Sequence, residues 1–522
     1  MADAATDAAK QIAAGYETDK PSIDLGRVSV GGVVDNEAIV KVPLAMFNRH
    51  GLIAGATGTG KTITLQLLAE NLSTAGVPVV VADMKGDLSG LTLPAAADGP
   101  AAGRFAELGV DFVPAASPVE YLSLGGIGAG VPVRSTISDF GPQLLSKILG
   151  SNETQEQSLA LLFHYADERK LPLVDLEDMR AMLMFLDSDE GKADLKGIGG
   201  VSTQTIGVLL RQITALGDAG GDEYFGEPQF DVADLMRIAP DGRGVISAIE
   251  LPAVQDKPAL FSTALMGMIA ELFETLPEAG DLEKPKLVFF FDESHLLFND
   301  ASKAFLESVA QTVRLIRSKG VGIFFVTQNP TDIPGEVLGQ LGARVQHALR
   351  AFTPDDAKAL KQTVSTYPKS EFYDLSEVLT SLGIGEAVVT VLSSKGVPTP
   401  VAHTRLLSPR SQMGLADNVQ ATTAQSKLYP KYATRVEGET AKELLEARIA
   451  ASAAAPGVTP TPAPIPEGAP PAAGTAPAPA SKPAKPKPEG NAVTDFLKSS
   501  QGKQIQNQLI RGAFGVLKSK MK

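Results

Sequence analysis

Two short stretches of the chain carry residue types and spacings suited to chemistry on a phosphate chain. The first, GATGTGKT at positions 55–62, fits the pattern G-x-x-x-x-G-K-[ST]. Its glycines allow positive φ and turn backbone N–H groups toward phosphates, while Lys61 can reach the β- and γ-phosphates and the Thr62 hydroxyl can ligate Mg²⁺. The alternative is a flexible turn with a surface lysine. The pattern predicts a nucleoside triphosphate site formed by Gly55, Ala56, Thr57, Gly58, Thr59, Gly60, Lys61 and Thr62.

The second stretch, LVFFFDESH at positions 287–295, is a buried-strand pattern that ends in two acids. Asp292 and Glu293 follow the apolar run, and open α/β sheets bind their ligands at the carboxyl ends of strands. We expect Asp292 to hold Mg²⁺ through water and Glu293 to polarise the attacking water, because hydrolysis needs both functions. The alternative is an acid pair that stabilises a helix N-terminus through the dipole. His295 is expected to pack or to form a hydrogen bond.

Two further apolar runs end in polar residues. GVGIFFVTQNP at 320–330 places Thr327 and Gln328 beside the end of the first strand if the sheet is doubly wound. Gln328 would then sense the γ-phosphate or position water; the alternative is a satisfied strand-end amide. Asp83 ends the run VVVAD and belongs to the same edge, whereas Lys85 and Asp87 are expected to lie in a solvated turn.

A charge that develops on the γ-phosphate favours a nearby guanidinium. Three arginines are candidates for this role: Arg317 in IRSKG, Arg344 in GARVQ and Arg350 in ALRAF. Each of them could equally form a surface or interface salt bridge.

The elements that must position these residues follow from hydrophobic periodicity. HGLIAG reads as a buried strand, residues 61–76 as a helix that ends at a glycine, and VPVVVAD as a second buried strand. Strand, helix and strand make a βαβ unit, which implies parallel strands in a covered sheet. Strand patterns resume after residue 243, alternating with helical ones, and indicate an antiparallel edge at the C-terminal end.

Composition narrows the class of protein. The 522 residues include no cysteine and five histidines, which excludes disulfides and argues against a structural zinc site. No run of about 18 apolar residues occurs, so no stable membrane insertion is expected. The first 20 residues lack the pattern of a signal peptide. We therefore expect a soluble, cytoplasmic protein.

Charge is distributed unevenly along the chain. The formal net charge is −13, of which residues 491–522 contribute +5 and residues 451–490 contribute +1, leaving −19 for the first 450 residues. This argues against a broad basic surface for nucleic acid but leaves room for a basic lining inside a ring. The basic C-terminal segment has an apolar stripe at i+4 spacing, for which we favour docking on the acidic body or on a neighbouring subunit. DNA binding, contact with an anionic membrane surface and a disordered solubilising tail are the alternatives.

The motifs resemble a known family. NRHGLIAGATGTGKTITLQLLAENLSTAGVPVVVADMKGDLSGL, LVFFFDESHLLF and VGIFFVTQNPTDIP are similar to the bacterial YjgR-like family, which carries a helicase HerA-like C-terminal domain within the HerA/FtsK branch of P-loop ATPases. The similarity extends in order across roughly residues 20–410. It implies a RecA-like core, with Asp292 and Glu293 as Walker B and catalytic acids and Gln328 as the sensor.

The resemblance also implies partners. Members of the branch form rings, often hexamers, in which a neighbouring subunit supplies an arginine; Arg317 occupies the matching position before the sensor strand. We therefore expect a homo-oligomer with ATP and Mg²⁺ as cofactors and DNA as a candidate substrate. Only a short β segment precedes the P-loop, which argues against the N-terminal barrel associated with HerA, and so against a nuclease partner and DNA translocation.

The expected fold is an α/β, RecA-like P-loop core with a mostly parallel sheet. Its organisation, in chain order, is a lead at 1–20, a β segment with the first part of the core at 21–99, a mainly helical insertion at 100–243, the second part of the core at 244–410, a helical extension at 411–450, an Ala/Pro-rich linker at 451–490 and a basic amphipathic helix at 491–522.

The functional interpretation is a Mg²⁺-dependent ATPase of the HerA/FtsK branch, with a DNA helicase or translocase motor as one reading. The alternative is an ATP-regulated interaction protein or assembly scaffold that does not act on DNA. A small-molecule kinase is the weaker third reading, because Glu293 directly after Asp292 suits activation of water.

Overall fold

The computed structural model describes residues 2–280, 282–299, 303–393 and 395–454, all within one compact unit. The predicted basic helix at 491–522, and the predicted linker beyond residue 454, lie outside the described residues. Among the residues described, no helix is long and apolar enough to cross a bilayer.

Twelve strands of the described chain form a single sheet in the order β2-β1-β12-β11-β10-β3-β9-β8-β4-β7-β5-β6. From β10 to β6 all neighbours are parallel, and from β2 to β10 all are antiparallel. The predicted mostly parallel sheet with an antiparallel edge is therefore confirmed. The strands are β1 (Ser22–Val30), β2 (Val33–Pro43), β3 (Gly51–Ala54), β4 (Val79–Asp83), β5 (Val119–Leu124), β6 (Val131–Val133), β7 (Ile246–Glu250), β8 (Leu287–Phe291), β9 (Val321–Thr327), β10 (Ala343–Gln346), β11 (Glu386–Thr390) and β12 (Ala402–Leu406).

The central strands are apolar on both faces because helices cover both sides of the sheet. In β8, Phe289 and Phe291 join one core cluster while Phe290 joins the other. The same alternation places Phe325 of β9 against Phe291, with ring centroids 5.6 Å apart, and Phe324 against Phe290 at 5.2 Å. A continuous apolar run therefore builds two cores at once, which fixes these strands in the middle of the sheet.

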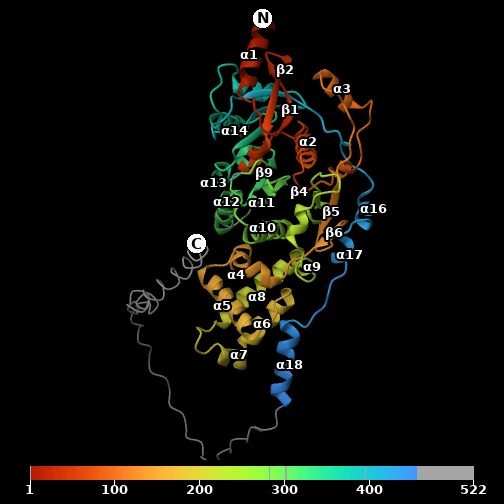
Figure 1. The fold of residues 1–522 in the computed structure, drawn as a ribbon. Helices are drawn as coiled ribbons and strands as arrows, with labels where there is room; N and C mark the ends of the chain where they lie inside the picture. The colour runs from red at the N-terminus through yellow and green to blue at the C-terminus, as the bar shows by residue number, and fades with distance from the viewer. Residues whose placement is uncertain (1, 281, 300–302, 394, 455–522) are drawn as a thin grey trace, which may run out of the picture. The chain divides into compact units, whose positions relative to one another are not determined.

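Helices α1 and α2 contribute to one core cluster, and α10 and α12 to the other (Figure 1). Helix α10 also packs against α4 and so connects the sheet with the helical block below it. The helices are α1 (Ala2–Ala14), α2 (Lys61–Thr74), α3 (Pro100–Glu107), α4 (Ile137–Ile148), α5 (Glu153–Arg169), α6 (Leu176–Asp187), α7 (Asp189–Asp194), α8 (Thr203–Leu216), α9 (Asp222–Tyr224), α10 (Pro258–Thr275), α11 (His295–Phe298), α12 (Lys303–Ile316), α13 (Gly335–Leu338), α14 (Pro354–Ser365), α15 (Leu375–Ser381), α16 (Val419–Ala424), α17 (Tyr429–Tyr432) and α18 (Ala441–Ala454).

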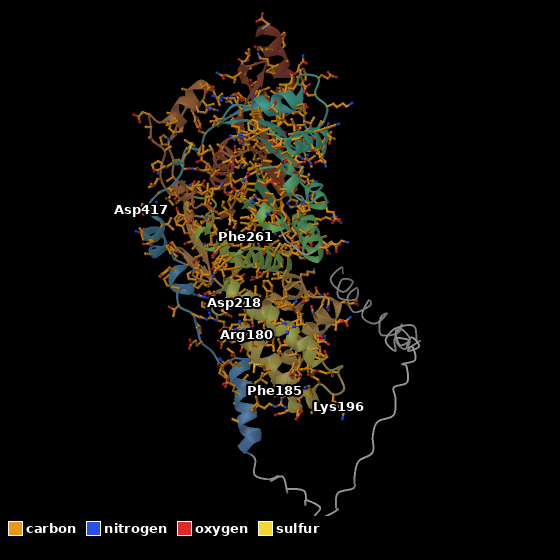
Figure 2. The ribbon with its side chains drawn as sticks, turned by 180° about the vertical axis from the view of Figure 1, so that it is seen from behind. Arg180, Phe185, Lys196, Asp218, Phe261 and Asp417 are labelled. Carbon is orange, nitrogen blue, oxygen red and sulfur yellow. The ribbon has the colours of Figure 1, made fainter. Side chains whose placement is uncertain are left out.

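The helical insertion is shorter than the predicted range of 100–243. Helices α4 to α9 form a separate block, which Figure 2 shows with Arg180, Phe185 and Lys196 labelled. Before this block, β5 and β6 extend the main sheet beyond β7. These strands are short and a glycine-rich turn joins them, so their pattern is weaker than that of the surrounding amphipathic helices.

The segment after β12 returns along the sheet to the helical block. It is anchored first on α2, where the buried Glu70 carboxylate accepts the backbone N–H groups of Arg410 and Ser411 at 2.7 and 3.1 Å. It ends in α18, which packs against α6 and places Arg448 on the Asp194 carboxylate at 2.9 Å. Helix α18 also continues to Ala454, four residues into the predicted linker. The segment therefore ties the helical block to the sheet.

Candidate nucleotide site

The loop between β3 and α2 has the geometry of a phosphate cradle. It turns at Gly55 (φ 155°), Gly58 (φ 80°) and Gly60 (φ 110°), and α2 begins directly afterwards at Lys61. A Cβ at Gly58 would meet nothing within 4 Å, so the apex of the loop faces open space. The helix N-terminus adds a positive dipole end beneath that space. Residues 55–62, which the sequence pattern singled out, therefore form a glycine-rich loop and the first residues of the helix that follows it.

Neighbouring strands hold the loop in place. The N–H of Gly55 donates to the carbonyl of Thr327 at 3.2 Å, and the N–H of Ala56 donates to the carbonyl of Ala348 at 2.8 Å. On the outer side, the N–H of Gly385 donates to the carbonyl of Thr59 at 3.4 Å. Backbone bonds from three separate elements thus fix the shape of the loop before any ligand binds.

Lys61 is buried within this loop, with 8% of its surface exposed. Its Nζ donates to the carbonyl of Ala56 at 3.3 Å. Burial lowers the pKa of Lys61, and the nearby Glu293 carboxylate opposes that shift. Phosphate oxygens would compensate the ammonium far better than one loop carbonyl does. Thr62 follows in the first turn of α2, partly exposed.

The two predicted acids lie at the carboxyl end of β8, two strands from β3 in the sheet. Asp292 is 2% exposed, and its Oδ2 is buried without a hydrogen-bond partner. Burial, reinforced by the adjacent Glu293 carboxylate, raises the pKa of Asp292 to about 7. A cation beside this carboxylate would stabilise its ionised form.

Glu293 has φ 45°, a conformation that non-glycine residues rarely adopt. This turn directs its carboxylate to Lys85, whose Nζ lies 2.5 Å from Oε1. Burial would raise the pKa of Glu293, but the hydrogen bond and the charge of Lys85 outweigh burial and lower it. His295 Nδ1 lies 3.4 Å from Oε2 of the same carboxylate, but the two atoms form no hydrogen bond, so the side chain packs beside Glu293.

Lys85 is exposed, as a solvated turn requires, but its ammonium is also paired with Glu293. The Asp83 carboxylate accepts N–H groups from Lys85, Gly86 and Leu88 at 3.2, 2.8 and 3.0 Å, and so folds the turn back toward β8. Lys85 thereby reaches the proposed catalytic acid. Only the pairing of β4 with β8 brings the two together, and no local signal in the sequence reports it.

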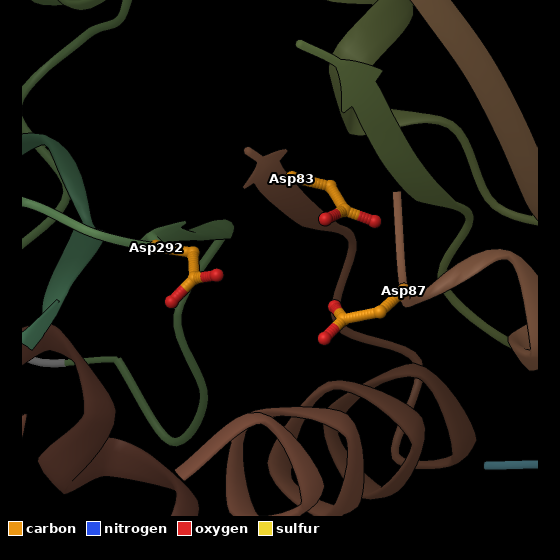
Figure 3. Close-up of side chains that lie close together, drawn as sticks. All are labelled: Asp83, Asp87 and Asp292. Atoms are coloured by element: carbon orange, nitrogen blue, oxygen red, sulfur yellow. The ribbon is translucent and has the colours of Figure 1, made fainter. Parts of the chain in front are cut away.

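Asp83, Asp87 and Asp292 form a cluster of carboxylates, with one oxygen of each within 4.8 Å of the others (Figure 3). Burial raises the pKa of Asp83 to about 6, against the backbone N–H groups that lower it. Asp83 already has three backbone donors, whereas Asp87 Oδ1 and Asp292 Oδ2 are buried without a hydrogen-bond partner, so these two residues have an oxygen free for a cation. The placement of Asp83 at this edge is as the sequence indicated.

Gln328 lies where the sequence placed it. It directly follows β9, which pairs with β3 so that Ala54 faces Thr327, and its side chain is exposed at this edge. The P-loop, the two acids and the sensor candidate thus converge from three parallel strands. The sequence missed His347, which lies beneath the loop with Nε2 2.9 Å from the Thr64 hydroxyl and with its Cβ 2.5 Å from a Cβ built at Gly55.

The three arginine candidates lie in different places. Arg350 is beside the P-loop of its own chain, with Nη2 3.4 Å from the carbonyl of Thr57. Arg344 is bound to Thr366 and lies 5.5 Å from the centroid of the Tyr367 ring. Arg317 follows α12 at the opposite end of β9 from Gln328. A seven-residue strand is about 20 Å long, so Arg317 cannot reach the P-loop of its own chain.

Comparison with protein families decides the relationship. A family model described as helicase HerA-like C-terminal matches residues 31–522. The chain belongs to this family. The expected HerA/FtsK branch is thereby confirmed, while the narrower YjgR-like resemblance stays a prediction.

Two curated relatives of the HerA-like chain are DNA double-strand break repair helicases named HerA. The protein from Sulfolobus acidocaldarius is 22% identical over 370 residues, which is 70% of this chain and 66% of the relative. The protein from Saccharolobus solfataricus is 20% identical over 376 residues, with the same two coverages. The match thus spans 66% of the length of these relatives.

Among solved structures, the HerA-like chain is similar to the bacterial conjugative coupling protein TrwBdeltaN70. The TM-score is 0.50 at 17% identity, and the match covers 78% of this chain and 92% of that one. At this identity the likeness concerns the fold. The prediction of a RecA-like α/β fold, within the HerA/FtsK branch of P-loop ATPases, is confirmed.

The Lys85–Glu293 ion pair leads to a first prediction. Replacing Lys85 by Met should lower ATP turnover by about tenfold or more. The Glu293 carboxylate would lose the ion pair that orients it, and a small displacement of a catalytic group slows the reaction strongly. ATP affinity should change little because Lys61 is untouched. Steady-state hydrolysis and direct titration would measure the two effects. Lys361→Met, at an exposed position on α14, is the matched control; unchanged turnover in Lys85→Met would remove the role assigned to this pair.

Proposed function

We propose that the HerA-like chain hydrolyses ATP in the presence of Mg²⁺ and works as a ring-shaped motor on DNA. One observation carries the ATPase part: Lys61 in the P-loop and the buried pair Asp292 and Glu293 lie at the same edge of one parallel sheet. In this arrangement the P-loop from Gly55 to Thr62 binds the phosphates. Lys61 binds the β- and γ-phosphates, and Gln328 contacts the γ-phosphate or the attacking water.

The residues at this edge fit a magnesium ion. The Thr62 hydroxyl and the Asp292 carboxylate are hard oxygen ligands of the kind that magnesium prefers. Oδ2 of Asp292 is buried without a hydrogen-bond partner, so it is free to accept a cation or its water ligand. When bound, Mg²⁺ neutralises charge on the β- and γ-phosphates. Asp292 would hold the ion through water, as the sequence indicated.

Glu293 is the residue that activates water. Its lowered pKa keeps the carboxylate ionised near neutral pH, so it can accept a proton from a water molecule positioned against the γ-phosphate. The Glu293 carboxylate is paired with Lys85, whereas Asp292 belongs to the carboxylate cluster with Asp83 and Asp87. The geometry thereby supports water, rather than a second substrate, as the nucleophile.

Two observations bear on DNA, in opposite directions. The curated relatives are DNA double-strand break repair helicases, which supports a DNA motor. The charge of −19 over the first 450 residues favours the alternative, an ATP-regulated scaffold that does not act on DNA. A ring whose basic residues line its channel is compatible with both observations, because a negative net charge does not exclude a local basic patch.

The proposed ring, with a hexamer as the expected form, would let Arg317 act on a neighbouring subunit. Arg317 cannot reach its own site, so a catalytic role requires the P-loop of a neighbouring subunit. Arg350 remains the alternative within the same subunit, and Arg344 is engaged by Thr366 and Tyr367. A nuclease partner is not part of the proposal.

Substitutions in the P-loop and at Glu293 should separate binding from hydrolysis. Lys61→Ala should abolish tight ATP binding, because it removes the charge aimed at the β- and γ-phosphates. Glu293→Gln should still bind ATP while turnover falls by roughly a hundredfold, in line with the loss of a positioned base. Calorimetric titration and phosphate release measure the two steps. Equal losses of binding and turnover in Glu293→Gln would refute the division of roles.

The response of ATP turnover to added DNA distinguishes a motor from a scaffold. ATP turnover should rise several-fold when single- or double-stranded DNA is added to the full chain, and the rise should shrink with salt because phosphate contacts release counterions. Mass determination with ATP and Mg²⁺ present would give the ring size. Turnover that stays the same with either form of DNA at low salt would favour the scaffold.

Complementation tests the arginine. Arg317→Ala should bind ATP normally and hydrolyse it poorly, and mixing it with Lys61→Ala should restore part of the activity. Mixed interfaces pair an intact P-loop with an intact Arg317 from its neighbour, so activity returns only if the site is shared. Subunit exchange is verified with labelled protein. Absence of complementation despite exchange would move the role to Arg350 or Arg344.

A further inference from the structure

The order of the strands gives the bound nucleotide a direction. The acids that act on the γ-phosphate stand on β8, which lies on the β9 side of the P-loop strand β3. A phosphate chain with its γ end toward β8 must leave the P-loop on the opposite side. On that side lie β10 and β11. The nucleoside end of the molecule therefore points to the loop that follows β10 and the loop that precedes β11.

Those two loops carry the two most exposed large apolar side chains of the described residues. Phe352, in the loop after β10, is 82% exposed, and Ile384, in the loop before β11, is 74% exposed. Both loops also touch the P-loop: Arg350 binds the carbonyl of Thr57, and the N–H of Gly385 binds the carbonyl of Thr59. Each exposed side chain is therefore two residues or fewer from a contact with the phosphate cradle.

The loop that carries Phe352 is fixed. The Asp356 carboxylate accepts the N–H groups of Phe352 and Thr353 at 3.1 and 2.9 Å, within the capping box that starts α14. On the other side, the N–H of Leu349 donates to the carbonyl of Leu379 at 2.8 Å, and the Leu349 side chain is buried. Several hydrogen bonds therefore hold the Phe352 loop in a conformation that leaves the aromatic side chain exposed beside the P-loop.

The loop that carries Ile384 is equally well held. The Glu386 carboxylate accepts the N–H of Gly383 at 2.8 Å, and Arg104 donates to the carbonyls of Gly385 and Leu406 at 3.2 and 3.1 Å. The Leu349–Leu379 bond ties the Phe352 loop to α15, which leads into this second loop. The two loops that carry Phe352 and Ile384 are therefore connected to each other through α15.

We propose that Phe352 and Ile384 form the base subsite of the nucleotide and contact the purine ring of ATP. A purine is a flat, largely apolar surface that stacks on an aromatic ring, so it matches what these loops display. The subsite rests on the proposed ATPase function, because the direction of the phosphate chain defines it. A neighbouring subunit is the other surface that could cover these side chains, and the experiment separates the two.

Two ligands distinguish base contacts from phosphate contacts. ATP carries both groups, whereas inorganic tripolyphosphate carries only the part that the P-loop holds. Calorimetric titration of the full-length protein with each ligand, in Mg²⁺ buffer, should show that Phe352→Ala weakens ATP binding about tenfold and leaves tripolyphosphate binding unchanged. Phe352→Tyr should bind ATP like the unaltered protein, since the ring is kept. Ile384→Ala should give a smaller loss of the same kind.

Ile449→Ala, at a half-exposed apolar position on α18, is the matched control and should alter neither affinity. Equal weakening of ATP and tripolyphosphate in Phe352→Ala would overturn the subsite, because the P-loop itself would then be disturbed. Unaltered ATP affinity, with or without a change of sedimentation, would also overturn it and assign Phe352 to another surface. If the unaltered protein binds neither ligand, the proposed ATPase function fails as well, so the two failures are distinguishable.

Discussion

The parallel alignment of β3, β9, β8 and β4 is the constraint on which the rest of the site depends. Parallel strands bring their carboxyl ends to the same edge, and the order β3-β9-β8-β4 places the P-loop, Gln328, the pair Asp292 and Glu293, and Asp83 along it. The order is held by apolar side chains on both faces, such as Phe290 against Phe324. Shifting any one of these strands by one residue would exchange its buried faces and move its polar end out of the site.

The same edge concentrates charge in a poorly solvated place. Lys61, Asp292 and Glu293 are each less than 9% exposed, and Lys85 joins them from the turn after β4. The carboxylates outnumber the ammonium groups, and Asp292 responds with a pKa raised by burial. Binding of phosphates with a divalent cation would supply partners for Lys61 and Asp292 together. The electrostatics of the site therefore fit the proposed binding of phosphates together with a divalent cation.

The helical block and the C-terminal segment give this core a second attachment. Glu70 on α2, the helix that begins at the P-loop, holds the chain at Arg410 and Ser411. The same segment then runs to α18 and to Arg448 on the helical block. The P-loop helix is therefore linked by a continuous segment of chain to helices far from the site.

The sequence by itself determined the P-loop, the acids after β8 and the alternation of the central strands, because these depend on residues close together in the chain: glycines that allow φ of 80° or more, and apolar runs that end in carboxylates. It also indicated where Asp83 and Gln328 lie, through the rule that parallel strands share an edge. Only the tertiary structure decided what Lys85, His347 and the three arginines contact, and that β5 and β6 belong to the sheet. The Lys85–Glu293 and Thr64–His347 contacts join residues 208 and 283 positions apart, and their geometry depends on strand order and turn shape rather than on any local pattern.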